Sequence, residues 1–100
     1  MKSDMYGFGV VLLETLTGLK ALDTKRPNEQ QNLVEWTRPM LETRKKLKKI
    51  MDPRLEQNYP LEAAVKCAKL IFRCLEHNPK DRPSSEEALH SLEQIYVINK

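Results

Sequence analysis

The amino-acid sequence predicts an all-α fold of about four to five helices in a single domain. Three observations support this prediction. Apolar residues recur at helical spacing in several stretches, prolines mark the loops between them, and no stretch alternates apolar and polar residues as a strand does. The length of 100 residues fits one domain with a modest core, and a composition of 40% apolar and 31% charged residues is that of a globular protein.

The first predicted helix covers residues 4–17, with Ser3 or Asp4 as its N-cap and Gly18 directly after its C-terminus. Side chains at positions 5–13 are apolar on every side, so no face is left to meet water. Such a helix is usually the centre of a larger structure, and a domain of this size seldom has enough other chain to wrap it. We therefore expect parts of it to be exposed and to promote self-association, including Phe8, Val11 and Leu12.

A polar loop at residues 26–28 separates this helix from a second, shorter one that begins at about Gln31. Pro39 is predicted to end or bend the second helix, because a proline disfavours helical geometry in the residue before it. The apolar residues of this helix are Leu33, Val34 and Trp36.

The segment LETRKKLKKIMDPRL, residues 41–55, contains the third predicted helix, which has one apolar and one basic side. We interpret the basic side as a solvated face with weak, non-specific affinity for polyanions, because apolar residues at helical spacing interrupt and follow it. Asp52 and Pro53 then mark a turn. The inward residues are Leu47, Ile50 and Met51, and the cations are Arg44, Lys45, Lys46, Lys48 and Lys49.

The last two predicted helices are amphipathic. The fourth helix, residues 61–75, has the clearest pattern, with an apolar stripe opposite a charged side. The fifth begins at Ser84, where Ser84 and Glu87 form a capping box after Pro83. The stripe of the fourth helix consists of Leu61, Ala64, Ala68, Ile71 and Leu75, and the inward residues of the fifth are Leu89, Leu92, Ile95 and Tyr96.

Cysteine and histidine usage predicts neither a disulfide nor a metal site. Cys67 and Cys74 lie on one predicted helix, where seven residues span about 10.5 Å. That separation exceeds the roughly 7 Å between Cα atoms that a disulfide allows, so we expect two free thiols packed on an apolar face. His77 and His90 stand alone and are interpreted as loop and surface residues.

Charge and hydropathy limit the partners and the location. Seventeen Lys and Arg against fourteen Asp and Glu give a net charge of +3, which is too small to imply a specific nucleic-acid partner. The apolar opening run is shorter than the about 18 to 20 residues that span a bilayer, and no basic region or cleavage site marks it as a signal peptide. We expect no transmembrane segment and a cytoplasmic location.

No catalytic motif is visible in the residues alone. Gly7 and Gly9 lie inside a helical pattern, with no preceding strand and no third glycine, so they do not form a phosphate-binding loop. The sequence also lacks a nucleophile elbow and a metal-ligand cluster. Periodicity by itself supports only a helical domain.

The chain resembles the C-terminal third of a serine/threonine protein kinase domain in four segments, which are KSDMYGFGVVLLETLTG, NLVEW, IMDPRL and CLEHNPKDRPSSEEALHSLE. The nearest resemblance is to plant receptor-like cytoplasmic kinases, within the receptor-like kinase superfamily. It implies that residues 1–97 are the C-terminal part of the helical large lobe, from helix F onward, and that residues 98–100 are a C-terminal tail. Helix F lies at the centre of that lobe, which would explain a first helix that is apolar on every side.

The resemblance implies roles for three residues. Asp4 matches the aspartate that caps helix F and accepts hydrogen bonds from the backbone of the catalytic loop. Arg82 matches the arginine that forms a buried ion pair with the glutamate of the Ala-Pro-Glu motif. Trp36 lies in the region of helix G, which in many kinases helps to dock substrates or partners. An ordinary N-cap at Asp4 and a core anchor at Trp36 are the structural alternatives.

The family motifs that handle ATP have no counterpart in this sequence. No segment corresponds to the Gly-rich loop or to the strand with the phosphate-binding lysine, and the His-Arg-Asp, Asp-Phe-Gly and Ala-Pro-Glu motifs are missing. We therefore expect no catalytic residue, cofactor site or metal site here, although the full domain would use ATP and Mg²⁺. Because Met1 directly precedes the first motif, we expect a truncated gene product or an excised fragment.

Three hypotheses for the function follow. The first is a kinase large-lobe fragment, inactive alone, whose parent transfers the γ-phosphoryl group of ATP to Ser or Thr. Its partners would be the missing N-terminal segment of the kinase domain and a protein substrate or an upstream receptor kinase. Any attachment to the plasma membrane would be made by segments that precede this chain. The second is a non-catalytic helical interaction module derived from a kinase lobe. The third is nucleic-acid binding through the basic segment.

Asp4 and Arg82 would both lack their family partners in this chain, because those partners lie upstream. We expect each side chain to be solvated or locally capped. Arg82→Ala should then change the free energy of unfolding by no more than about 0.5 kcal/mol. In a complete domain, removing one member of a buried ion pair should cost about 3 to 5 kcal/mol.

Overall fold

The computed structural model describes the backbone of residues 2–55 and 59–99 and the side chains of residues 4–55 and 59–95. Over these residues the chain is helical and has no strand, apart from an isolated antiparallel bridge between Leu22 and Asn32. The all-α prediction is confirmed. The α-helices are α1 (Lys2–Thr17), α2 (Leu33–Thr37), α3 (Arg44–Ile50), α4 (Leu61–Cys74) and α5 (Ser85–Asn99), and the 3₁₀ turns are η1 (Asn28–Gln30), η2 (Arg38–Glu42), η3 (Pro53–Leu55) and η4 (Pro79–Asp81).

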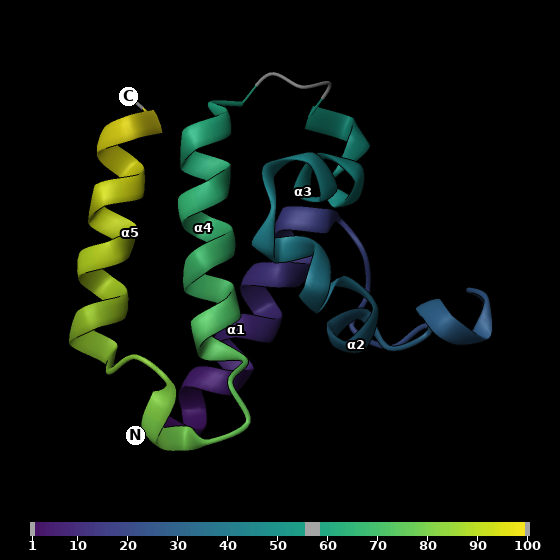
Figure 1. Ribbon diagram of the computed structural model, residues 1–100, viewed down its shortest axis with the longest axis horizontal. Coiled ribbons are helices and arrows are strands. Elements are labelled where there is room, and N and C mark those ends of the chain that lie inside the picture. The colour runs from purple at the N-terminus through teal and green to yellow at the C-terminus, as the bar shows by residue number, and fades with distance from the viewer. Residues whose placement is uncertain (1, 56–58, 100) are drawn as a thin grey trace.

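Helix α4 occupies the centre of the arrangement. It packs against α5 on one side and against α1, α3 and η2 on the other (Figure 1). The loop that joins the antiparallel α4 and α5 contains η4, which also contacts α1. Helix α1 packs mainly against α4, although its sequence is apolar on every side, and part of its surface is therefore left uncovered.

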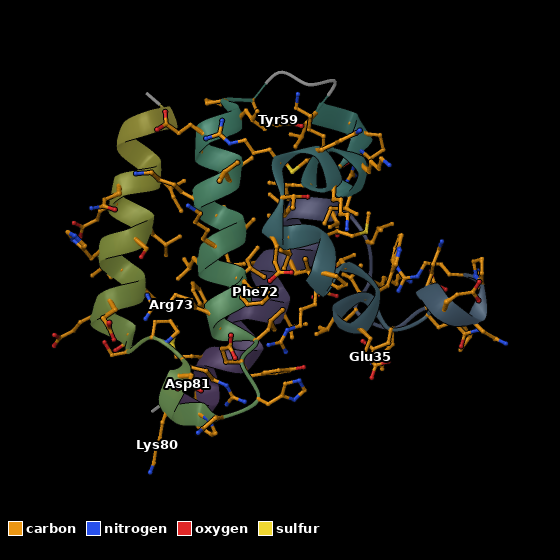
Figure 2. The ribbon with its side chains drawn as sticks, in the orientation of Figure 1. Glu35, Tyr59, Phe72, Arg73, Lys80 and Asp81 are labelled. Carbon is orange, nitrogen blue, oxygen red and sulfur yellow. The ribbon has the colours of Figure 1, made fainter. Side chains whose placement is uncertain are left out.

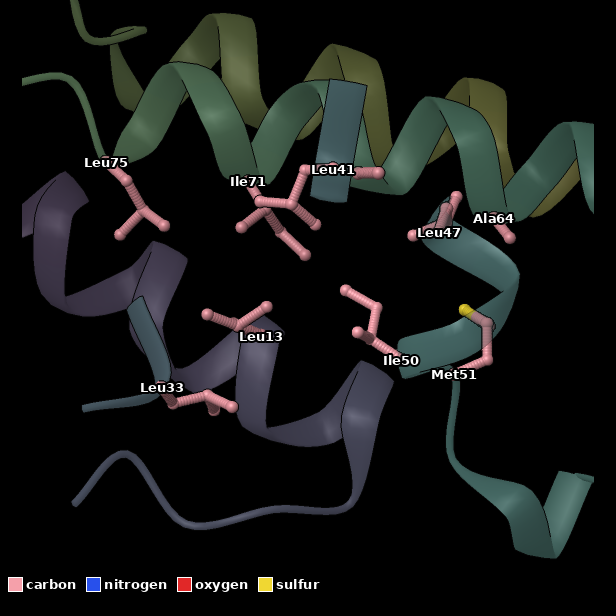
Figure 3. Close-up of a cluster of buried hydrophobic side chains, with 10 residues drawn as sticks. Leu13, Leu33, Leu41, Leu47, Ile50, Met51, Ala64, Ile71 and Leu75 are labelled. Atoms are coloured by element: carbon pink, nitrogen blue, oxygen red, sulfur yellow. The ribbon is translucent and has the colours of Figure 1, made fainter. Parts of the chain in front are cut away.

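The main core lies where α1, α3, α4 and η2 meet (Figure 3). Leu13, Ile71 and Leu75 are fully buried there, and burying a Leu or Ile side chain contributes about 1.5 to 3 kcal/mol. The stripe predicted on the fourth helix is confirmed, except that Leu61 is only half-buried. The buried residues of this core are Leu13, Leu33, Leu41, Leu47, Ile50, Met51, Ala64, Ala68, Ile71 and Leu75.

The prediction for α1 is wrong at the start of the helix and confirmed at its end. The helix begins at Lys2, so Ser3 and Asp4 lie inside it and the N-cap predicted at these residues is wrong. An acidic residue is still favourable in this first turn, because the helix N-terminus carries partial positive charge. The prediction for Gly18 is confirmed, since Gly18 has φ +72° and its N–H donates to the carbonyl of Glu14 at 2.8 Å.

The exposure predicted along α1 is confirmed in part. Val11 is 58% exposed, whereas Phe8 and Leu12 are half-buried. Phe8 and Leu12 pack against a second, smaller core that joins α1 to α4 and α5. Its buried residues are Met5, Leu70, Cys74 and Ala88.

Helix α2 begins at Leu33, slightly later than predicted. Asn32 is extended, with φ −97° and ψ 109°, and it is bridged to Leu22. Its side-chain oxygen accepts a hydrogen bond from the N–H of Glu35 at 3.3 Å, so Asn32 is the N-cap. Pro39 ends the α-helix as predicted. The helix stops at Thr37, and the chain continues into the 3₁₀ turn η2, which has Pro39 in its first turn.

Helix α3 turns its cations to solvent and its apolar side to the core, as predicted. Thr43 is its N-cap, and the Thr43 hydroxyl accepts a hydrogen bond from the N–H of Lys46 at 3.3 Å. The turn predicted at Asp52 is also confirmed. The carboxylate of Asp52 accepts a hydrogen bond from the N–H of Arg54 at 2.9 Å at the start of η3.

The start of α5 is fixed by the predicted capping box. The N–H of Ser84 donates to Oε1 of Glu87 at 3.0 Å, and the N–H of Glu87 donates to the hydroxyl of Ser84 at 3.1 Å. These reciprocal bonds satisfy donors that the helix start would otherwise leave without a partner. The helix then extends to Asn99.

The inward face predicted for α5 is wrong at one position. Leu89 is 58% exposed, and Ala88 is buried in its place. Helix α5 packs mainly on α4, so only a narrow stripe of it is covered. Leu92 and Ile95 are half-buried on that stripe, and the side chain of Tyr96 lies outside the described residues.

Candidate functional site

Arg82 follows η4 and is held by backbone carbonyls of the loop that follows α4. Its Nε donates to the carbonyl of Glu76 at 2.8 Å and its Nη2 to the carbonyl of His77 at 3.4 Å. Its guanidinium carbon lies 5.1 Å from the centre of the Tyr6 ring, within the range of a cation–π contact. Arg82 therefore connects the loop between α4 and α5 to α1.

These contacts correct one expectation and support another. Arg82 is half-buried and hydrogen-bonded, so the small effect expected of Arg82→Ala, which assumed an exposed and unpaired side chain, no longer follows. Local capping, the alternative expected for this residue, is what the structure contains. The carbonyls that it binds, those of Glu76 and His77, lie in the loop directly after Leu75, the C-cap of α4.

Asp4 lies at the edge of a groove between the first turns of α1 and the first half of α5. The side chain of Asp4 is exposed, and the groove has a volume of about 270 Å³. Its lining is almost wholly apolar apart from Asp4 and Ser85. The apolar residues that line it are Met5, Phe8, Ala88, Leu89 and Leu92.

Trp36 is half-buried on α2 and packs against the main core. The guanidinium of Arg26 lies 5.8 Å from the centre of its ring, and Nη2 of Arg26 donates to the carbonyls of Lys20 and Gln31 at 2.8 and 3.0 Å. Trp36 therefore helps to hold the loop that precedes α2. This is the core-anchor alternative raised for Trp36, and a docking role for its surface stays a prediction.

Two interactions that the sequence did not reveal fix the surroundings of these residues. The guanidinium of Arg38, on η2, donates to the carbonyl of Leu75 at 2.9 Å and stacks on the ring of Phe72 at 5.0 Å. Asp52 receives two hydrogen bonds from Nε of Arg54, both at 3.1 Å, and one from its Nη2 at 2.7 Å. No short motif marks the Arg38 contact, whereas the Asp-Pro-Arg spacing at 52–54 is a detectable turn signal.

The pKa of Asp52 follows from this geometry. The side-chain hydrogen bonds from Arg54, followed by its backbone N–H, hold the pKa of Asp52 below the ordinary value, although burial acts in the opposite direction. The same side-chain hydrogen bonds raise the pKa of Arg54. The pair is thus a charged clamp at the turn after α3.

The two thiols are unsuited to nucleophilic chemistry. Both cysteines are free, as predicted from their helical spacing, and Cys67 is half-buried while Cys74 is buried. Burial, with a smaller contribution from Cys74, raises the pKa of Cys67 to about 11. Burial also raises the pKa of Cys74, although the charges of Arg73 and Arg82 act against it. A thiol with a raised pKa holds little reactive thiolate at neutral pH.

Neither a metal centre nor a membrane span is found in the described part of the chain. Residues 4–55 and 59–95 bring together no group of three His, Cys, Asp or Glu side chains that could hold a metal ion. No helix within the described ranges is both long and apolar enough to cross a bilayer. His77 and His90 are exposed, on the loop after α4 and on α5, as interpreted from the sequence.

Comparison with known proteins connects this geometry to a family. No protein-family model matches the chain. The EPD1-interacting receptor-like cytoplasmic serine/threonine-protein kinase of Nicotiana benthamiana is 53% identical over 94 residues, which are 94% of this chain and 20% of that kinase. The probable serine/threonine-protein kinase PBL8 and the serine/threonine-protein kinase PBL13 of Arabidopsis thaliana are each 50% identical over 94% of this chain, which matches 23% and 19% of their lengths.

This chain is homologous to part of the plant receptor-like cytoplasmic serine/threonine kinases. It spans about a fifth of the length of the kinases it matches. The resemblance drawn from the sequence motifs is confirmed, and so is the interpretation of the helices as a fragment of the kinase large lobe.

Proposed function

We propose that this chain is the C-terminal part of the large lobe of a serine/threonine kinase, from helix F onward. The complete domain would transfer the γ-phosphoryl group of ATP, with Mg²⁺, to Ser or Thr of a protein substrate. The observation that carries the proposal is the identity of about half of all residues to such kinases across 94% of the chain. Residues 1–97 would belong to the lobe and residues 98–100 to a C-terminal tail.

The chain alone is proposed to be inactive and to bind neither ATP nor Mg²⁺. Phosphoryl transfer is catalysed by groups that position the nucleotide phosphates, the metal ions and the attacking hydroxyl. The sequence motifs that supply those groups in protein kinases have no counterpart in this chain. What remains is a helical scaffold, with α4 at its centre.

Three residues are proposed to act structurally in the complete domain. Asp4 would accept hydrogen bonds from the catalytic-loop backbone, and its exposure at the edge of the α1–α5 groove leaves it accessible to a preceding segment. Arg82 would exchange a carbonyl contact for the glutamate of an Ala-Pro-Glu motif. Trp36 would present its exposed part to a protein substrate or partner, such as an upstream receptor kinase. The cytoplasm would be the location, with any plasma-membrane attachment made by other segments.

A second candidate function is a non-catalytic interaction module. The specific observation in its favour is the apolar groove of about 270 Å³ between α1 and α5, together with the exposed Val11 on α1. Exposed apolar surface of this kind marks protein interaction sites. The third hypothesis, specific nucleic-acid binding through α3, gains no further support from the geometry, because the cations of α3 simply face solvent.

Two experiments test the proposal. Sequencing the transcript upstream of Met1 distinguishes the candidates, because in-frame kinase motifs there support the lobe fragment, whereas a genuine start codon and accumulation of the short protein support the module. Thermal melting of the chain with and without millimolar Mg-ATP tests inactivity, because a ligand that binds only the folded state raises its stability. We expect no shift beyond that of a matched salt control. A shift of several degrees specific to Mg-ATP would overturn the proposed inactivity.

A further inference from the structure

Two grooves flank the exposed side of α4 and share two cationic residues. One groove, of about 220 Å³, lies between α4 and α5. The other, of about 380 Å³, lies between α4 and η2. Lys69 and Arg73 line both of them, so the two grooves form one continuous surface across α4. We call this surface the α4 crossing.

The groove toward α5 is positively charged. Lys66, Lys69 and Arg73 lie along one side of α4 at a spacing of three and four residues, which places them on one helix face. Lys66 and Lys69 are exposed, and neither forms an ion pair with any described residue. Ser91 and Gln94 of α5 add polar groups opposite the cations, and the apolar Leu70 of α4 completes the lining.

Arg73 is only loosely held. Its Nη2 lies 3.6 Å from Oε2 of Glu87, and both side chains are about half exposed. Exposed ion pairs of this kind contribute little, so an incoming carboxylate can compete with Glu87 for the guanidinium. The other oxygen of Glu87 accepts the Ser84 N–H in the capping box and would keep that role.

The groove toward η2 is apolar at its base. Leu41 and Phe72 line it, and Glu42 stands at its edge. Figure 2 shows Phe72 on the side of α4 that faces η2 and Arg73 on the side that faces α5. An apolar side chain from a bound molecule would contact Phe72 while neighbouring acidic groups contacted Lys69 and Arg73.

We propose that the α4 crossing is a docking surface for an acidic protein segment that carries one apolar anchor residue. The charge complementarity comes from Lys66, Lys69 and Arg73, and the anchor would enter the groove between Leu41 and Phe72. This surface is separate from Asp4, Arg82 and Trp36, and it requires no catalytic group, so it does not depend on the proposed kinase activity.

A protein segment fits this surface better than a nucleic acid does. Carboxylates of Glu42 and Glu87 stand on the two sides of the cationic stripe and would repel a continuous polyphosphate backbone. A peptide can place its few acidic residues between them and insert an apolar side chain, whereas nucleic-acid backbones offer a regular row of phosphates. Steering by the cations should make the association sensitive to salt.

The test uses fluorescence anisotropy to measure how a fluorescein-labelled short peptide of Asp and Glu with a single central Phe binds to the 100-residue chain. The variant Lys66→Glu/Lys69→Glu reverses two charges on the α4 crossing. The matched control Lys45→Glu/Lys46→Glu makes the same change in net charge on the exposed side of α3. Because all four lysines are exposed, circular dichroism should show both variants folded, and Lys66→Gln/Lys69→Gln provides a milder version.

We expect saturable binding that weakens at least about tenfold in the α4 variant and less than about twofold in the α3 control. Replacing the central Phe of the peptide by Ser should also weaken binding several-fold. Equal losses in the two variants would overturn the proposal, because they would show diffuse charge attraction, and so would the absence of saturable binding. A single-stranded oligonucleotide is tested in the same way. If it binds more tightly than the peptide and this binding is lost in the α4 variant, the ligand is a nucleic acid and the proposal is overturned.

Discussion

The guanidinium of Arg38 reaches across to the end of α4, where its Nη1 donates to the carbonyl of Leu75 at 2.9 Å. Leu75 is the C-cap of α4, and its carbonyl is one of those that a helix end leaves without an intrahelical partner. The same guanidinium stacks on Phe72 and lies 3.5 Å from Oε2 of Glu76. A single side chain therefore holds η2 against the central helix.

Arg38→Ala should lower the free energy of unfolding by about 1 to 2 kcal/mol, because a part-buried carbonyl loses its donor and Phe72 loses its stacking partner. Urea denaturation followed by circular dichroism measures the change. Arg44→Ala, on the exposed side of α3, removes the same charge and should stay within about 0.5 kcal/mol. Equal losses in the two variants would show that the Arg38 contacts contribute no stability.

Arg82→Ala should cost about 1 to 2 kcal/mol in this chain, since two hydrogen bonds to backbone carbonyls and the contact with Tyr6 are lost. Combining Arg82→Ala with Tyr6→Leu in a double-mutant cycle isolates the contact between the two side chains. We expect a coupling energy of about 0.5 to 1 kcal/mol. Strict additivity would contradict the stacking.

Two glycines of α1 should respond oppositely to the same substitution. A Cβ at Gly9 would lie 2.6 Å from Cβ of Cys74 on α4, so Gly9→Ala should force the helices apart and cost about 1 to 3 kcal/mol. A Cβ at Gly7 would meet nothing within 4 Å, so Gly7→Ala should stabilise the helix by about 0.5 to 1 kcal/mol. Denaturation midpoints of the two variants check this, and a gain in both would mean that α1 and α4 are not in close contact.

The dependence of stability on pH should report the clamp between Asp52 and Arg54. The pKa of Asp52 is lower in the folded chain than the value of about 3.9 expected when unfolded. Its contribution is therefore present above that unfolded value and is lost as the pH falls through the lower folded value. In Asp52→Asn, stability in urea should fall less steeply below about pH 4 than in the unsubstituted chain. Parallel curves would show that Asp52 is not held by Arg54.

Alkylation of the thiols should be slow in the folded chain. Because the pKa of Cys67 is about 11 and that of Cys74 is also raised, iodoacetamide at neutral pH meets little thiolate. Unfolding in urea should bring both thiols to the rate of an ordinary cysteine. Mass spectrometry counts the adducts with time, and rapid labelling of Cys74 in the folded chain would contradict its burial against α1.

Local signals of the sequence predict the elements well. The capping box of Ser84 and Glu87, the left-handed Gly18 and the helix-ending Pro39 each depend on residues within a few positions, and the structure has all three. The apolar stripe of α4 is likewise encoded by its own periodicity. These features need no knowledge of the rest of the chain.

Long-range packing explains what the sequence did not predict. Asn32, the N-cap of α2, is also bridged to Leu22 ten positions earlier, and the exposure of Leu89 depends on how little of α5 is covered by α4. The contact between Arg38 and Leu75 joins residues 37 positions apart. The periodicity of one segment contains no information on such partners, whereas the resemblance of whole motifs indicated the family.

Exchange of segments tests the kinase assignment most directly. The experiment is a chimera of the serine/threonine-protein kinase PBL13 of Arabidopsis thaliana, in which this chain replaces the segment that aligns with it. The assay measures phosphate transfer from labelled ATP to a protein substrate. If this chain is the C-terminal part of a kinase large lobe, the folded chimera should retain phosphotransfer within about tenfold of the parent, which corresponds to about 1.4 kcal/mol in the barrier. A folded chimera that binds Mg-ATP but transfers no phosphate would contradict the assignment.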